Sequence, residues 1–210
     1  MSAIVDIMTK GGPVMWPLLL CSIVALAITI ERFYSLSRAG ADPEKLIGKV
    51  KDALKKKDFR VAVGYCEATP GPVAAALATA IDLHDLELEE LKEGVNEAFL
   101  EEAPRMERGL PILSTLVTVA PLLGLLGTIT GLMKLFSVIA GGHIGNSEQL
   151  SGGIAEALIT TATGLTIAII FMIFHNLLAA RVDRIINQME KSVTELVNFM
   201  RMEGRADVSN

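Results

Sequence analysis

Three long apolar runs constrain the fold of this 210-residue chain more than any other feature. The first reads VMWPLLLCSIVALAITI over 14–30, the second covers 110–140 with Lys134 as its only charge, and the third covers 157–180, directly after Glu156. About 20 apolar residues suffice to cross a bilayer. A soluble bundle would show a polar stripe every 3.6 residues, and these runs show none of useful width. They predict an all-α integral membrane protein with three transmembrane helices and further, partly cytoplasmic helices.

Composition supports this class and argues against two others. Hydrophobic residues make up 51% of the chain, and the mean hydropathy is +0.47. The net charge of −5 disfavours nucleic acid, which binds to a basic face. His84, His143 and His175 fall in three separate regions, and no phosphate-binding glycine motif or metal-ligand spacing occurs. We therefore expect neither an enzyme nor a bound cofactor or metal, and we expect Cys21 and Cys66 to be packing residues.

The distribution of Lys and Arg predicts the orientation in the membrane. Twelve of the nineteen lie within 31–109, five more follow from Arg181 onward, and GGHIGNSEQLSGG at 141–153 has none. Cytoplasmic segments carry the excess of Lys and Arg, so the amino terminus is expected outside and the carboxyl terminus inside. The expected order is an external segment (1–12), a first span retained as an anchor (13–34), a cytoplasmic helical region (35–109), a second span (110–140), an external turn (141–153), a third span (154–180), and a cytoplasmic helix and tail (181–210).

The cytoplasmic region shows several helix signals. Asp42 followed by Pro43 is typical of an N-cap and first helical residue, and Asp58 predicts a second start. TPGP at 69–72 is a break before a third short helix. From residue 86 the pattern favours one long amphipathic helix that runs into the second span, kinked by Pro104.

Three glycines lie on one side of the second span. Gly124, Gly127 and Gly131 recur at helical spacing, which allows a neighbouring backbone to approach closely. Thr128 sits in the same patch. Its hydroxyl could bond a carbonyl of its own helix or serve an ion path, and the sequence alone leaves both open.

The stretch IAEALITTATGL at 154–165 places a carboxylate at the start of the third span. An intramembrane carboxylate marks an ion path by default, although Glu156 could also face water or pair with Lys134. His175, near the inner end, could transfer protons or lie at the interface. On a helical wheel Glu156, Thr160 and Thr163 share one side. A second, narrow face suits close packing or a pore wall and contains Ala157, Thr161, Gly164, Ala168 and His175.

At these residues the sequence resembles the MotA/TolQ/ExbB family of proton-channel subunits, and it looks closest to the ExbB branch. The resemblance rests on GGPVMWPLLLCSIVALAITIERF at 11–33, ERGLPILSTLVTVAPLLGLLGTITGLMKLF at 107–136, and GGIAEALITTATGLTIAI at 152–169. With the loop lengths included it covers nearly the whole chain.

The resemblance implies a homopentamer in the bacterial inner membrane around a single-span partner of the ExbD, TolR or MotB type, whose transmembrane aspartate takes up the proton. No predicted span of this chain contains an aspartate. By motif position, Thr128, Glu156 and Thr161 would line or border the proton path. The implied ion is H⁺, and the implied output is TonB-dependent outer-membrane transport through a TonB-like protein.

Several alternatives remain open at this stage. A TolQ-like envelope-maintenance subunit or a gliding or secretion motor has the same motifs. A membrane scaffold would use the glycines and threonines for packing alone, and a self-sufficient ring would use Glu156 as its own proton carrier. Lys134 and Thr160 depart from the expected family pattern and bear on ion selectivity.

Overall fold

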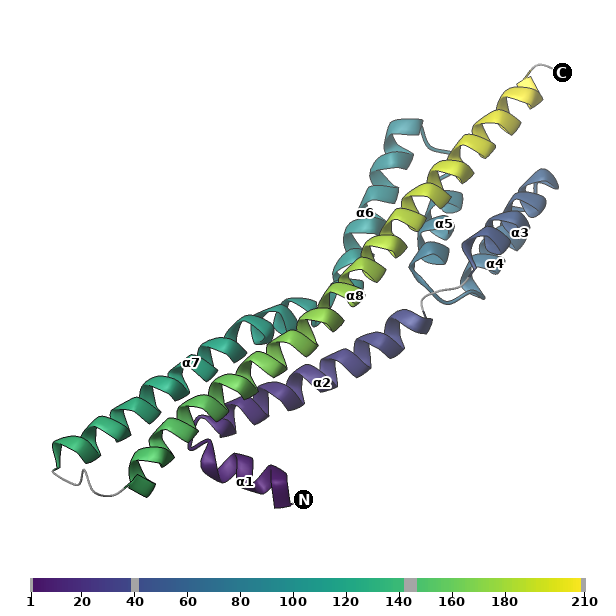
Figure 1. Cartoon of the computed structure of the whole chain (residues 1–210). Helices are drawn as coiled ribbons and strands as arrows, with labels where there is room; N and C mark the ends of the chain where they lie inside the picture. The colour runs from purple at the N-terminus through teal and green to yellow at the C-terminus, as the bar shows by residue number, and fades with distance from the viewer. Residues whose placement is uncertain (1, 39–41, 142–146, 209–210) are drawn as a thin grey trace. The chain divides into compact units, whose positions relative to one another are not determined.

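The computed structural model describes residues 2–38, 42–141 and 147–208, and every regular element in these ranges is a helix. The prediction of an all-α chain is confirmed. The elements, labelled in Figure 1, are α1 (Ser2–Lys10), α2 (Met15–Arg38), α3 (Pro43–Lys55), α4 (Phe59–Glu67), α5 (Pro72–Asp82), α6 (Leu88–Glu107), α7 (Leu110–Ala140) and α8 (Ser147–Val208).

Among the described residues, three stretches of helix are long and apolar enough to cross a membrane, as predicted. They fall within Met15–Ser37, Leu88–Ala140 and Leu150–Glu203. Large apolar side chains on these helices remain exposed: 69% of Trp16, 66% of Leu158 and 64% of Leu177. So wide an apolar surface would be a liability in water, whereas lipid or other subunits can cover it.

The chain divides into two compact units. Unit 1 contains residues 1–31 and 109–177, and unit 2 contains residues 32–108 and 178–210. In unit 1 the start of α2 packs with α7 and α8 around a small buried cluster made of Val14, Met15, Leu18, Ala120 and Ala168. Helix α1, for which the sequence analysis gave no prediction, precedes these elements.

Unit 2 is a helical domain that consists of α3–α6 and the last part of α8, and α3 and α6 line clefts together with α8. That part of α8 buries an apolar stripe whose members recur every three or four residues, as expected for one face of a helix. The stripe consists of Leu178, Val182, Ile185, Met189, Val193 and Leu196. Helices α3, α4 and α5 contact one another in sequence, and α5 contacts α6.

Two helix starts in unit 2 follow the sequence signals in different ways. The Asp58 carboxylate accepts a hydrogen bond from the Val61 amide at 3.1 Å and caps α4. Asp42 occupies the N-cap position of α3, but its side chain makes no cap bond and instead pairs with Lys45 at 2.9 Å. The hydrogen bond from Lys45 lowers the pKa of Asp42 below its ordinary value.

The expectation of one helix running from residue 86 into the second span is wrong. Helix α6 ends at Glu107 and α7 begins at Leu110. Gly109 between them has φ +82°, a left-handed conformation that glycine adopts without the steric cost of a side chain. Pro104 is accommodated inside α6, whereas the break occurs at Gly109.

Helix α8 begins earlier than the third span predicted at 154–180. Residues 147–153, expected in the external turn, already belong to α8, and 142–146, which include His143, lie outside the described residues. The helix then continues for 62 residues to Val208.

Arg32, at the start of unit 2, is a buried charge that the sequence analysis did not single out. Its side chain is 5% exposed, and its guanidinium donates to the carbonyl oxygens of Arg105 at 3.1 Å and Met106 at 3.5 Å. The last carbonyls of a helix have no partner within the helix. Arg32 thus satisfies the carboxyl end of α6.

Cys66 on α4 should react slowly with thiol reagents in the folded protein. Burial, with the charges of Asp82 and Glu67 adding to it, raises the pKa of the thiol from 9.0 to about 11. At pH 8 this lowers the thiolate fraction about a hundredfold, and the thiolate is the reacting form. In a Cys21→Ser background, N-ethylmaleimide labelling followed by mass spectrometry should be slow until denaturant is added.

The same shift sets a pH dependence of stability. The raised pKa means that the folded state holds the thiol proton more tightly than the unfolded state. The resulting contribution to the free energy of unfolding is complete below about pH 9 and is lost as the pH rises toward 11.

In the labelling experiment, equal rates for native and denatured protein at pH 8 would show that Cys66 is not buried as described.

Candidate functional site

The candidate site lies along the contact between α7 and the first part of α8, both in unit 1. Gly131 of α7 is so close to α8 that an added Cβ would lie 2.6 Å from the Gly153 carbonyl oxygen and 3.0 Å from the Ala157 amide nitrogen. A Cβ on Gly153 would in turn lie 2.8 Å from the Gly131 carbonyl oxygen. At this level the two backbones touch.

The contact continues along both helices. A Cβ on Gly124 would lie 3.0 Å from the Thr160 carbonyl oxygen, and one on Gly164 would lie 2.5 Å from the Ala120 carbonyl oxygen. A Cβ on Gly127 would collide with the side chain of Thr160. The four glycines singled out in the sequence therefore all lie between α7 and α8, and we call this contact, from Ala120 to Gly131 on α7 and from Gly153 to Ala168 on α8, the glycine seam.

Glu156 lies beside the seam and pairs with Lys134 of α7. The Lys134 ammonium lies 2.8 Å from Oε1 and 2.6 Å from Oε2 of Glu156, so it donates to both carboxylate oxygens. The Glu156 side chain is 8% exposed, whereas that of Lys134 is 54% exposed. Leaving a buried charge without its partner costs about 3–5 kcal/mol, and Lys134 removes this cost.

The amino-terminal part of the chain covers the same carboxylate. Gly12, in the turn before α2, has φ +69°, and an added Cβ there would collide with Glu156 Oε1. The sequence analysis missed Gly12. The GG pair at 11–12 directly before a span was the signal available, since a glycine often marks close approach of another group.

The threonines on α8 use their hydroxyls differently. Thr160 is fully buried and donates within its own helix, to the carbonyls of Glu156 at 2.9 Å and Ala157 at 3.1 Å. Thr161 is partly buried, and its hydroxyl lies 3.1 Å from the Gly124 carbonyl of α7 as well as 3.1 Å from that of Ala157. Thr161 therefore supplies a polar contact between the two helices within the seam.

The remaining predicted residues stand apart from this group. Thr128 bonds the Leu125 carbonyl of its own helix at 2.7 Å, and Thr163 bonds that of Ile159 at 2.8 Å. His175 lies 3.3 Å from the side-chain oxygen of Asn176. In the described part of the chain, none of these three side chains bonds to Glu156, Lys134 or Thr161.

The narrow face of α8 is covered by α7 of the same chain. Ala157 and Ala168 are buried, and Gly164 touches the α7 backbone. Within one chain, this part of the face therefore serves close packing. Exposed apolar side chains occur on α2 and α8, and also on the side of α7 that faces away from the seam, where they include Leu122, Leu125, Ile129, Met133 and Phe136.

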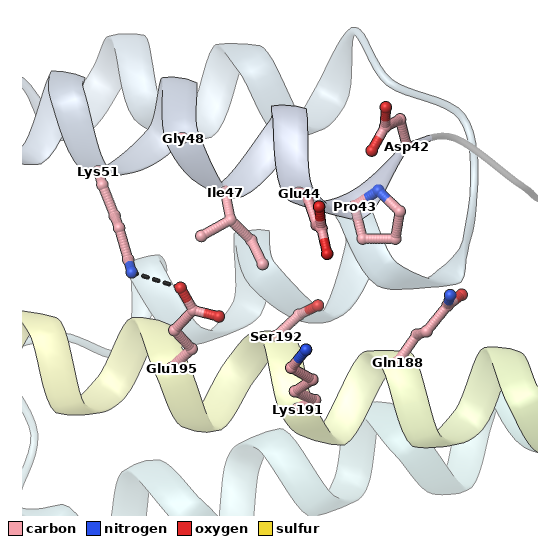
Figure 2. Close-up of a pocket in the computed structure, with 10 residues that line it drawn as sticks. All are labelled: Asp42, Pro43, Glu44, Ile47, Gly48, Lys51, Gln188, Lys191, Ser192 and Glu195. Carbon is pink, nitrogen blue, oxygen red and sulfur yellow. Dashed lines mark hydrogen bonds and ion pairs between the residues drawn. The ribbon is translucent and has the colours of Figure 1, made fainter.

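A cleft between α3 and α8 in unit 2, with a volume of about 530 Å³, is one of several concave sites in the described residues (Figure 2). Two of its charged side chains pair with each other, Lys51 Nζ lying 2.6 Å from Glu195 Oε1. Asp42, at its edge, pairs with Lys45. Among the described residues, no cluster of His, Cys, Asp and Glu could hold a metal ion. Glu44 and Lys191, both exposed, also line the cleft, so it holds surface charges of both signs and no buried carboxylate comparable with Glu156.

Comparison with known proteins identifies the class to which this site belongs. Residues 68–191, more than half of the chain, match the profile of the MotA/TolQ/ExbB proton channel family. The chain belongs to this family. It is a proton-channel subunit of the ExbB/TolQ type and a multi-pass inner-membrane protein.

Individual family members match over most of their length. The biopolymer transport protein designated ExbB-like 1 of Synechocystis sp. is 34% identical over 180 residues, which cover 84% of this chain and 71% of that protein. The ExbB homolog of Methanothermobacter thermautotrophicus is 27% identical over 97% of this chain and 75% of its own. The Tol-Pal system protein TolQ of Haemophilus influenzae is 27% identical over 87% of this chain and 85% of its own.

The glycine seam predicts a sharp difference between two adjacent residues. Gly153→Ala should lower the thermal stability of the purified protein, because the added methyl group meets the α7 backbone; overpacking of this kind costs about 1–3 kcal/mol. Gly152→Ala is the matched control, since an added Cβ there meets nothing within 4 Å. Thermal unfolding in detergent followed by circular dichroism measures both, and equal midpoints would contradict the seam.

Proposed function

We propose that this chain is the ring-forming subunit of an ion-driven motor in the inner membrane of a diderm bacterium. Five copies would surround the transmembrane helices of two copies of a single-span partner of the ExbD or TolR type. Protons moving down the proton motive force would drive movement of the partner helices, which would then act at a distance. In the ExbB form of this proposal, the output is TonB-dependent outer-membrane transport through a TonB-like protein.

The observation that carries this proposal is the buried Glu156 carboxylate with its Lys134 counter-ion beside the glycine seam. Ionisable side chains are expensive inside a membrane and are found where ions pass. Because the chain belongs to a proton channel family, the ion that passes this pair is expected to be a proton. The pair is already neutralised within the chain, and none of the three spans contains an aspartate. A carboxylate that cycles between charged and protonated forms must then come from a partner.

The proposed path uses the family positions Thr128, Glu156 and Thr161. Protons would enter from the periplasm, protonate the partner's aspartate beside Thr128 and Thr161, and leave to the cytoplasm. A carboxylate and its protonated form favour different surroundings, so alternating neutralisation would favour movement of the partner within the ring. A threonine hydroxyl that donates to a carbonyl keeps lone pairs that can accept a further hydrogen bond, which suits Thr161 to a site along this path.

A TolQ-like role in envelope maintenance is the second candidate. The similarity to TolQ of Haemophilus influenzae over most of both chains supports it, although the ExbB-like relative is more similar, at 34% identity against 27%. The two roles differ in the external domain of the partner. A neighbouring gene for a TonB-like protein would favour the ExbB role, and one for a Pal-like lipoprotein would favour the TolQ role.

Substitution at the proposed path should abolish energised transport without dispersing the complex. We expect Glu156→Gln and Thr161→Ala each to abolish transport driven by the proton motive force, measured as a loss of at least about tenfold, which is equivalent to 1.4 kcal/mol. Thr166→Ala is the matched control, because Thr166 is exposed on the same helix and its hydroxyl donates to the Ala162 carbonyl of that helix at 2.7 Å.

Transport is measured in cells that lack the wild-type gene, and assembly by co-purification of the partner with a tagged chain. Full activity of a correctly assembled Glu156→Gln or Thr161→Ala variant would remove that residue from the path. A scaffold that only packs helices would tolerate both substitutions.

A further inference from the structure

We propose that Lys134 is a specificity-determining residue that occupies the cation position at Glu156 and so keeps metal cations from binding to this carboxylate beside the proton path. The inference rests on the proposed function, because it concerns the ion that reaches the path. It assigns a role to a charge that departs from the expected family pattern within the second span.

The position of the ammonium is the first argument. Lys134 Nζ lies 2.6 and 2.8 Å from the two oxygens of Glu156, on the side of the carboxylate where a bound cation would sit. The ammonium is a tethered cation with three donors and no acceptor. A sodium ion approaching Glu156 would therefore meet a like charge at the position that it has to occupy.

The lack of further oxygen ligands is the second argument. Hard metal cations are held by several oxygen atoms at once. Near Glu156, the Thr160 hydroxyl is directed into its own helix, where it bonds two backbone carbonyls. The turn at Gly12 lies against Oε1 and leaves no space there even for a Cβ atom. Within the described residues, Lys134 is the only charged side chain bonded to Glu156.

A proton differs from a metal ion in both respects. It needs no coordination shell and can reach a carboxylate oxygen when one of the two contacts with the ammonium loosens. Without the ammonium, a buried carboxylate would have two ways to be neutralised, by a proton or by a metal cation. Lys134 would thus remove the second possibility while leaving the first.

Carbodiimide labelling tests this directly, because dicyclohexylcarbodiimide reacts with protonated carboxyl groups in apolar sites and a bound cation protects them. The test uses the complex extracted from its own host's membranes, in sodium chloride or choline chloride, with modification of Glu156 followed by mass spectrometry. In the wild type we expect slow labelling that sodium does not change. In Lys134→Gln we expect labelling at least about tenfold faster in choline chloride, a factor equivalent to 1.4 kcal/mol, and slowed by sodium.

Two further variants control the experiment. Lys134→Arg retains a cation at the same position and should behave like the wild type. Lys10→Gln removes an exposed cation of α1 in the same unit and should change nothing. Protection of wild-type Glu156 by sodium would overturn the proposal even if Lys134→Gln failed to fold. Labelling of a folded Lys134→Gln variant that is slow or insensitive to sodium would overturn it as well.

The outcome separates this inference from the proposed function. Carbodiimide labelling reports on occupancy of Glu156, whereas proton flux through the same complex in liposomes reports on conduction. If Glu156 shows the labelling expected above but the complex conducts no protons, the proposed motor function is contradicted and the role of Lys134 is not. If the complex conducts protons but sodium protects wild-type Glu156 from labelling, the role of Lys134 is contradicted and the motor function is not.

Discussion

Contact between the backbones of α7 and α8 is the constraint on which the membrane unit depends. Lipid tails are as apolar as leucine, so helices in a membrane gain little from hiding apolar side chains and associate through close packing and hydrogen bonds instead. Gly131 and Gly153 allow the two backbones to touch, and the Thr161 hydroxyl adds a polar contact to the Gly124 carbonyl. The seam holds two long helices in one register, and it is this register that brings Lys134 of α7 within reach of Glu156 on α8.

The fixed register of the two helices determines the geometry of the Lys134–Glu156 ion pair. A carboxylate that stayed free in the membrane would be costly and could adopt several orientations. Here both of its oxygens are bonded to one ammonium, and the turn at Gly12 covers one of them. The charge that would move during a proposed cycle is then not Glu156 but a group of the partner, whose energy depends on the fixed dipoles and charges around it. The subunit would act as a preorganised surface against which the partner changes its protonation state.

Much of this architecture was predictable because it depends on local patterns. Run length and the absence of a polar stripe gave three membrane helices, and the spacing of Gly124, Gly127 and Gly131 indicated close packing. The pairing of Glu156 with Lys134 was one of the alternatives that the sequence indicated, whereas most other features set by tertiary neighbours were not predictable. The glycine pair at 11–12 indicates a close approach but not that Glu156 is the neighbour, and nothing local indicates that Arg32 would satisfy the end of α6. The break at Gly109 was missed because the amphipathic pattern continues through it, and glycine alone does not reveal a left-handed conformation.

Native mass spectrometry of the complex, extracted gently from the membranes of its own host, tests the central claim most directly. A subunit whose own intramembrane carboxylate is already paired needs a partner that brings the cycling charge. The account therefore predicts a ring of identical copies of this chain that contains a small single-span protein, with five and two copies as the expected stoichiometry. A stable ring that contains this chain alone, and still conducts protons, would contradict it and would make Glu156 the carrier in its own right.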